Sequence, residues 1–146
     1  MIIGLIAGLI LLLVVVAAAY LADRASGGTP LGDLRRGECF NLTKSLVGQK
    51  VERVSCSAGH TDEVAGALLL PAGPGAGYPG RDGILDLGKR GCPSQVGEFY
   101  GKKPPTVAET FVFGPDEAAW NKGERAVVCS LREPSVAKRT GSYLDG

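Results

Sequence analysis

The sequence has only one histidine, His60, and it lacks the short motifs that usually carry enzyme chemistry. It has no glycine-rich phosphate loop, no serine nucleophile elbow and no pair of histidines at metal-binding spacing. These absences exclude the nucleotide-dependent enzymes, serine hydrolases and zinc peptidases that such motifs define. We therefore expect no cofactor and no enzyme activity.

The sequence also lacks an excess of charge of either sign. Its 16 lysines and arginines nearly balance 15 aspartates and glutamates, and the two signs are mixed along the chain. This balance predicts no basic face for nucleic acid and no acidic tail for cations. Nucleic acid is therefore not expected as a partner.

Charged side chains are missing altogether from Met1–Ala22. At 1.5 Å of rise per residue, a helix of this length reaches about 33 Å, enough to cross the hydrocarbon core of a bilayer. Apolar residues on every side leave it no polar face. We expect a transmembrane anchor over residues 1–22 with the lipid bilayer as partner, although the small residues Ala17–Ala19 leave a cleaved signal peptide open.

Two features of the sequence indicate opposite orientations of this segment in the membrane. The nearby basic residues, Arg24, Arg35 and Arg36, follow the segment, which by the positive-inside rule places the body in the cytoplasm. The cysteines instead indicate an oxidising compartment. We follow the cysteines and expect a single-pass protein of the cell membrane with an extracytoplasmic C-terminal domain.

The remainder of the chain is long enough for one domain. Residues 23–36 are expected to form a juxtamembrane linker, because residues 25–30 within it are small and flexible, and residues 37–133 hold the candidate extracytoplasmic domain. Beyond Pro134 the sequence has little to bury, so residues 134–146 are expected to form a mobile tail.

The hydrophobic pattern predicts an α+β fold. About five short strands form an antiparallel sheet, with one main helix and one short helix on a face. The main helix covers residues 82–99, and Pro93 inside it predicts a kink or a break into two helices. The short helix begins near Pro115 and ends at Asn121. The expected strands are 38–42, 49–56, 63–70, 110–113 and 125–131. For residues 63–70 a helix stays open, because alanine and leucine are strong helix formers and so short a run does not decide by its period.

Four cysteines, Cys39, Cys56, Cys92 and Cys129, stand at long spacings without a CxxC pair. In a domain of this size, that pattern indicates disulfides, for which three pairings are possible. We favour Cys39–Cys56 between the first two strands, which leaves Cys92 on the helix to meet Cys129 on the last strand. In the chain-entropy model these bonds contribute about 3 and about 4 kcal/mol.

Two chemical alternatives involve Cys56 and His60. A zinc site needs four ligands at recognisable spacings, and none is apparent. A secreted Cys-His hydrolase needs a free, activated thiolate, which a paired Cys56 cannot supply. We expect no metal site and no catalytic residue, and we interpret His60 as a turn residue whose ring hydrogen-bonds locally or to the core.

A series of landmarks along the body resembles a known family. The landmarks are Gly37-Glu38-Cys39-Phe40, Val54-Ser55-Cys56, His60-Thr61-Asp62-Glu63-Val64, Tyr78-Pro79-Gly80, Cys92, Phe99-Tyr100-Gly101, Pro115, Trp120, Gly123-Glu124-Arg125, Cys129 and Gly141-Ser142. Over residues 37–142 they resemble the septum-formation domain of actinobacterial single-pass membrane proteins. Gly59 replaces the proline that usually precedes the histidine of that pattern, and Glu38 and Glu124 replace aspartates. The resemblance implies an envelope-facing domain connected with septum or cell-wall processes, with no established chemistry.

We therefore expect a non-catalytic binding or scaffold domain of the cell envelope, with an envelope or membrane protein as its partner. An accessory subunit of a membrane assembly is one form that such a domain would take. The candidate contact residues are Tyr78 in the loop 71–80, His60 and Trp120. For Trp120 we favour a second interpretation, in which it covers the sheet edge with Arg125 beside it. A carrier of lipid or of another small apolar ligand stays open, and an apolar pocket under the loop 71–80 would favour it.

Overall fold

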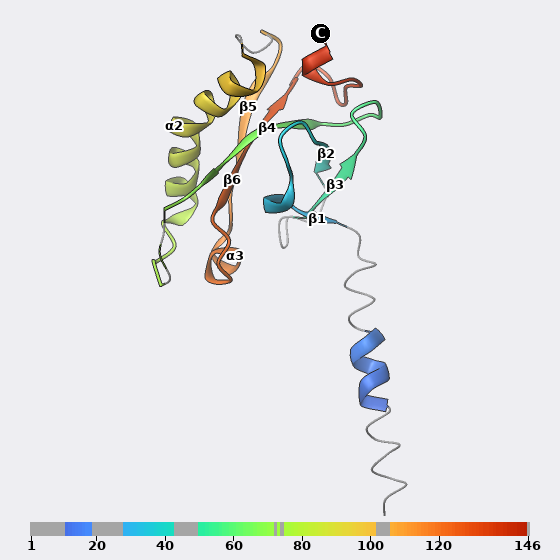
Figure 1. Ribbon diagram of the computed structural model, residues 1–146, viewed down its shortest axis with the longest axis vertical. Coiled ribbons are helices and arrows are strands. Elements are labelled where there is room, and N and C mark those ends of the chain that lie inside the picture. The colour runs from blue at the N-terminus through green and yellow to red at the C-terminus, as the bar shows by residue number, and fades with distance from the viewer. Residues whose placement is uncertain are drawn as a thin grey trace, which may run out of the picture.

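The computed structural model describes residues 11–18, 28–42, 50–71, 73, 75–101 and 106–145. It is an α+β fold with one six-stranded sheet (Figure 1). The strands are β1 Thr29–Pro30, β2 Cys39–Leu42, β3 Lys50–Val54, β4 Asp62–Leu69, β5 Glu109–Phe113 and β6 Ala126–Arg132. The labelled helices are α2 Gly80–Tyr100 and α3 Glu117–Asn121, and 3-10 turns lie at Leu31–Asp33 and Tyr143–Asp145.

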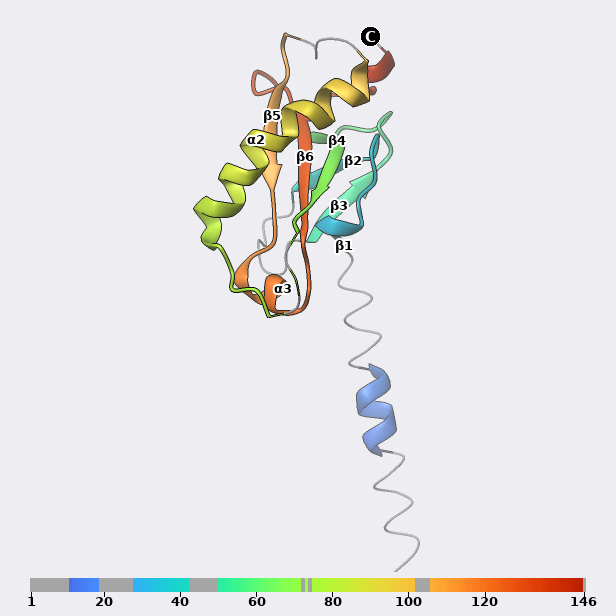
Figure 2. The same ribbon diagram turned by 60° about the vertical axis from the view of Figure 1, so that its left-hand side comes forward.

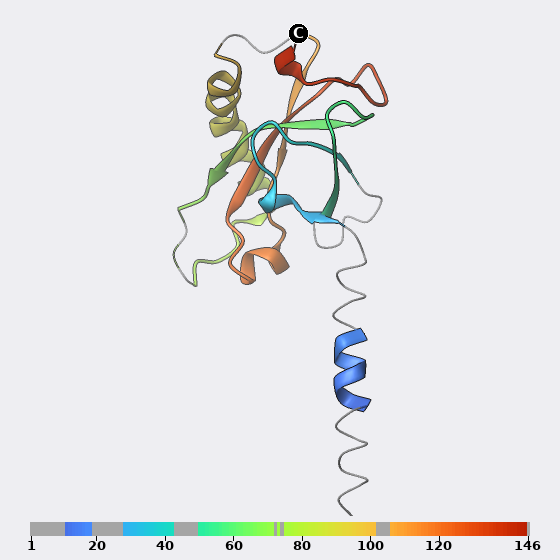
Figure 3. The same cartoon turned by 45° about the vertical axis from the view of Figure 1, so that its right-hand side comes forward.

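The sheet is antiparallel throughout and has the strand order β1-β3-β2-β4-β6-β5. It curls, so that β3, β4 and β6 surround a common interior (Figure 3). The turn Leu31–Asp33 that follows β1 packs against β6 across this interior. The two edge strands, β1 and β5, therefore belong to sheet ends that are brought toward one another.

Helix α2 covers the outer face of β4, β5 and β6 (Figure 2). Glycines let it approach closely, because a Cβ at Gly88 would collide with Val112 of β5 and one at Gly91 with Leu68 of β4. Between these glycines and the helix end, Cys92 is tied to Cys129 of β6. The helix is thus held against the sheet by both shape and a covalent bond.

The core has one apolar cluster inside the curl and two under α2. The interior cluster consists of Leu31, Leu34, Phe40, Val51, Val64 and Val128, with Phe113 packed against it. The clusters under α2 consist of Ala65, Val96, Leu131 and Tyr143 at one end and of Leu70, Ile84, Trp120 and Val127 at the other. Alternate residues of β6 thus face opposite sides of the sheet, as the strand period requires.

The α+β class and the five expected strands are confirmed, with ends shifted by one or two residues. The structure adds the two-residue strand β1, whose pairing with Lys50 and Val51 no local pattern announces. Helix α2 continues through Pro93, so the prediction of two separate helices is wrong. Gly101 ends α2 in the left-handed conformation at φ 56°, which glycine adopts without strain.

The transmembrane helix expected over residues 1–22 is contradicted. Within this range residues 11–18 are described, as helix, and residues 1–10 and 19–22 lie outside the described part of the chain. None of the helices in the described residues combines the length and the apolar character needed to cross a membrane.

The prediction for the C-terminal segment is also corrected, because residues 139–143 pack on the domain. Tyr143 is buried in the cluster under the end of α2. Arg139 forms a β-bridge with His60 through two 2.9 Å backbone hydrogen bonds. The buried Glu63 carboxylate accepts hydrogen bonds from Ser142 Oγ at 2.6 Å and from the Tyr143 backbone N–H at 2.7 Å. The prediction that this segment buries little is therefore wrong.

Candidate functional site

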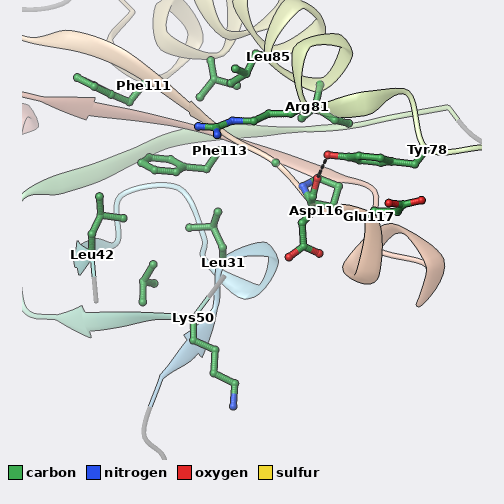
Figure 4. Close-up of a pocket in the computed structure, with 15 residues that line it drawn as sticks. Leu31, Leu42, Lys50, Tyr78, Arg81, Leu85, Phe111, Phe113, Asp116 and Glu117 are labelled. Carbon is green, nitrogen blue, oxygen red and sulfur yellow. Dashed lines mark hydrogen bonds between the residues drawn. The ribbon is translucent and has the colours of Figure 1, made fainter. Parts of the chain in front are cut away.

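An apolar cleft of about 630 Å³ opens where the two ends of the curled sheet approach one another (Figure 4). Phe111 and Phe113 of β5 line one wall. Leu31, Leu42 and Val51, from the turn after β1 and from β2 and β3, line the opposite wall. The cleft is thus built from residues that are distant in sequence and meet only because the sheet curls.

Polar groups lie at the α2 and α3 end of the cleft. Arg81 extends from the start of α2 across the cleft toward Phe113, next to Leu85 (Figure 4). Asp116 accepts a 2.8 Å hydrogen bond from the Ala119 N–H and so caps α3. Because Asp116 already has this role, Arg81 is the side chain best placed to bind a group that enters the cleft.

Arg81 is exposed, and among the described residues it makes no hydrogen bond, ion pair or ring contact. Its position in the first turn of α2 is unfavourable for a cation, since the N-terminal end of a helix carries partial positive charge. Sequence reasoning missed Arg81, although an arginine directly after Gly80 at a helix start is the signal that could have found it. An anionic group in the cleft would be attracted by both the guanidinium and the helix end.

Tyr78, a predicted contact residue, lines the cleft and is half-buried. Its hydroxyl donates a 3.2 Å hydrogen bond to the Pro115 carbonyl, and its ring meets Trp120 edge to face. Tyr78 is the residue of the loop 71–80 that lines this cleft.

Trp120 packs in the cluster under α2 with Leu70, Ile84 and Val127, and the Arg125 guanidinium lies beside it as expected, 3.8 Å from the centre of its ring. Its indole N–H donates a 2.7 Å hydrogen bond to the Ala76 carbonyl, which fixes part of the loop before α2. The side chain is 3 % exposed, so Trp120 supports the cleft from behind and does not itself present a contact surface.

Both disulfides are confirmed in the pairing we favoured, Cys39–Cys56 and Cys92–Cys129. No cysteine is free, and all four lie in the described part of the chain. The first bond joins β2 to the turn after β3, and the second joins α2 to β6. Neither Cys56 nor Cys39 is therefore a thiolate in this structure.

His60 is completely buried, and its Nδ1 lies 2.9 Å from the Ala58 carbonyl, the local hydrogen bond expected of it. Cys39, His60 and Glu63 place ligand-type atoms within 4.8 Å of one another. Cys39 is spent in a disulfide, and both Glu63 oxygens accept hydrogen bonds, so this group fits neither the zinc interpretation nor the Cys-His hydrolase. Burial also removes His60 from the surface residues that a partner could touch.

A second buried carboxylate, Asp62, was not predicted from the sequence. It accepts hydrogen bonds from Ser130 Oγ at 2.9 Å, from Thr61 Oγ1 at 2.7 Å and from the Arg132 guanidinium at 2.7 Å. The same guanidinium lies 4.3 Å from the centre of the Phe111 ring. Asp62 therefore fixes one end of the cleft wall through Arg132.

Two tyrosines near the C-terminal segment make alkaline pH a test of its packing. Burial raises the pKa of the Tyr100 phenol above its usual range, and the Glu63 carboxylate adds to this shift; burial likewise raises the pKa of Tyr143. A group whose pKa is raised on folding contributes stability that is complete below its unfolded pKa, about 10, and is lost as the pH rises above that value.

We expect the thermal unfolding midpoint to fall as the pH rises from about 9 to about 12. In the Tyr100→Phe/Tyr143→Phe variant this fall should be much smaller, because neither hydroxyl has a hydrogen-bond partner among the described residues and phenylalanine cannot ionise. Circular dichroism melts across this pH range measure the effect. An unchanged alkaline fall in the double variant would contradict the assignment.

A family model described as Septum formation matches residues 36–144. No curated protein and no solved structure matches the chain. The match includes β2 to β6, both disulfides and most of the C-terminal segment that packs on them.

Proposed function

Because the chain belongs to the septum-formation family, we propose that it serves septum formation as a non-catalytic binding domain of the cell envelope, placed outside the cytoplasm. The two disulfides support this location, since such bonds persist in oxidising compartments. They also support a non-catalytic role, because they remove every thiol that could act as a nucleophile.

The observation that carries the proposal is the cleft between β5 and the turn after β1. It is apolar, it measures about 630 Å³, and it is bordered by Arg81 and Tyr78. Sites of this kind, with apolar walls and few polar groups, are typical of ligand and partner binding. The disulfide between α2 and β6 and the Asp62–Arg132 pair make the surrounding body rigid, which lowers the entropic cost of binding.

Substitution of Leu42 by arginine tests the proposal. Leu42 lines the cleft and is 38 % exposed, so an arginine there should fill the cleft without unfolding the domain. The full chain is purified from cells of its natural source, and the amount of envelope protein that accompanies it is measured. With Leu42→Arg this amount should be at least about tenfold lower than with the wild type, since a hot-spot loss of this size is common at binding sites.

The matched control is Val136→Arg, because Val136 is 42 % exposed and does not line the cleft. It should retain the accompanying protein. Equal recovery with Leu42→Arg and Val136→Arg, or no accompanying envelope protein with the wild type, would contradict the proposal.

A second candidate function, the carrier of a small apolar ligand, is favoured by the size and apolar walls of the same cleft. An acidic head group would then meet Arg81. Solvent extraction of the purified chain followed by mass spectrometry tests it: a stoichiometric amphipathic acid that is lost with Leu42→Arg supports the carrier, and a protein free of such a molecule speaks against it.

A further inference from the structure

We propose that the cleft receives an extended peptide segment of a partner protein, which pairs with β5 as a seventh strand of the sheet. This inference rests on the binding function proposed above and specifies the chemistry of the partner. The peptide would have apolar side chains at alternate positions and an acidic residue between them.

The first support is the free edge of β5. Strand β5 pairs only with β6, and no described residue pairs with its other edge. The opposite edge of the sheet is protected, because β1 has only two residues and ends in Pro30. Strand β5 lacks the features that usually protect an edge strand from pairing. It has five residues, its sequence ETFVF contains no lysine or proline, and its register with β6 has no bulge.

The second support is the position of the cleft along this edge. Residues of β5 form one wall, and the apolar residues Leu31 and Leu42 face them across the opening (Figure 4). An added strand would gain main-chain hydrogen bonds from β5 and side-chain burial in the cleft. These two sources give affinity and specificity in known cases of strand addition.

The alternation of β5 predicts the sequence of the peptide. Phe113 packs on the interior cluster, whereas Val112 lies against Gly88 of α2, so Phe111 and Phe113 share the interior face. Peptide residues opposite these two phenylalanines would enter the cleft and should be apolar. The residue between them would face the side of α2, the helix from which Arg81 extends into the cleft, and Arg81 has no acidic partner among the described residues. That residue should be acidic.

The experiment uses the full chain and fluorescein-labelled peptides with the pattern Ser-Thr-Φ-Glu-Φ-Thr-Ser, blocked at both ends, in which Φ is valine, leucine or phenylalanine. Fluorescence polarisation measures binding. The tightest peptide is then prepared in two forms with N-methyl groups on alternate amides. Since only one set of amides faces β5, one form should lose at least about tenfold in affinity and the other should bind nearly as the parent.

Charge exchange tests the role of Arg81. Arg81→Glu should weaken binding of the glutamate peptide about fivefold, as expected for a partly exposed ion pair, and should restore binding of the matching lysine peptide. The control is Arg90→Glu, because Arg90 lies on the same helix, pairs with Asp86 and does not line the cleft. It should leave both affinities unchanged.

Equal affinity of the two N-methylated forms would overturn strand addition, and equal effects of Arg81→Glu and Arg90→Glu would overturn the acidic contact. Failure of every peptide to bind, while the wild-type chain still recovers an envelope protein that Leu42→Arg loses, would refute this inference and leave the proposed function standing.

Discussion

Replacement of Asp62 by alanine is expected to lower the free energy of unfolding by about 3–5 kcal/mol, because it leaves the partner of a buried ion pair without compensation. Asp62 is 0 % exposed, and Arg132 is only partly exposed. The substitution would also leave the Ser130 hydroxyl without its acceptor inside the curl. Urea unfolding followed by circular dichroism measures the loss.

The matched control for Asp62→Ala is Asp86→Ala. Asp86 and Arg90 also form an ion pair, at 2.8 Å, but both side chains are more than half exposed, at 60 % and 67 %. Its loss should cost less than about 1 kcal/mol. Similar losses in the two variants would contradict the structural role given to Asp62, as would a Phe111 environment, read by NMR, that does not change in Asp62→Ala.

Removal of the Cys92–Cys129 bridge, by alanine at both positions, is expected to cost about 4 kcal/mol in the chain-entropy model. The bond closes a loop with a sequence separation of 37 residues. It also joins α2 to β6 between two apolar clusters, so its loss should loosen the wall of the cleft that α2 supports. Denaturant unfolding of the variant against the wild type gives the difference.

The other bridge provides the comparison. Cys39–Cys56 has a separation of 17 residues, and alanine at both positions should cost about 3 kcal/mol. We further expect the Cys92→Ala/Cys129→Ala variant to bind the peptide less tightly, because the position of Arg81 depends on α2. A bridge variant as stable as the wild type, or a clearly larger loss at Cys39–Cys56, would contradict these expectations.

The sequence predicted those features that depend on local patterns or on very few alternatives. Four cysteines allow only three pairings. The helix that carries Cys92 and the strand that carries Cys129 were recognisable from their hydrophobic periods. The position of Trp120 beside Arg125 followed from a short helix and turn next to the last strand. In these places local propensity and tertiary packing agree.

The features that sequence reasoning missed depend on contacts between distant residues. Glu63 accepts hydrogen bonds from Ser142 and Tyr143, which lie 79 and 80 positions further along the chain. Nothing near Glu63 in the sequence therefore predicted that the C-terminal segment would pack on it. The cleft requires the curl of the sheet, which brings Phe113 to Leu31. The transmembrane helix over residues 1–22 was expected from hydropathy alone, and no helix within the described residues is long and apolar enough to cross a membrane.

All four cysteines of the native domain are held in disulfide bonds, so none is left as the thiolate that a Cys-His hydrolase needs. Intact-mass analysis after alkylation under denaturing conditions without reductant tests this pairing. We predict that freshly isolated protein takes up no alkyl group and that reduction beforehand gives four. Alkylation of two or four cysteines without reduction would contradict the claim and would reopen the Cys-His alternative at Cys56 and His60.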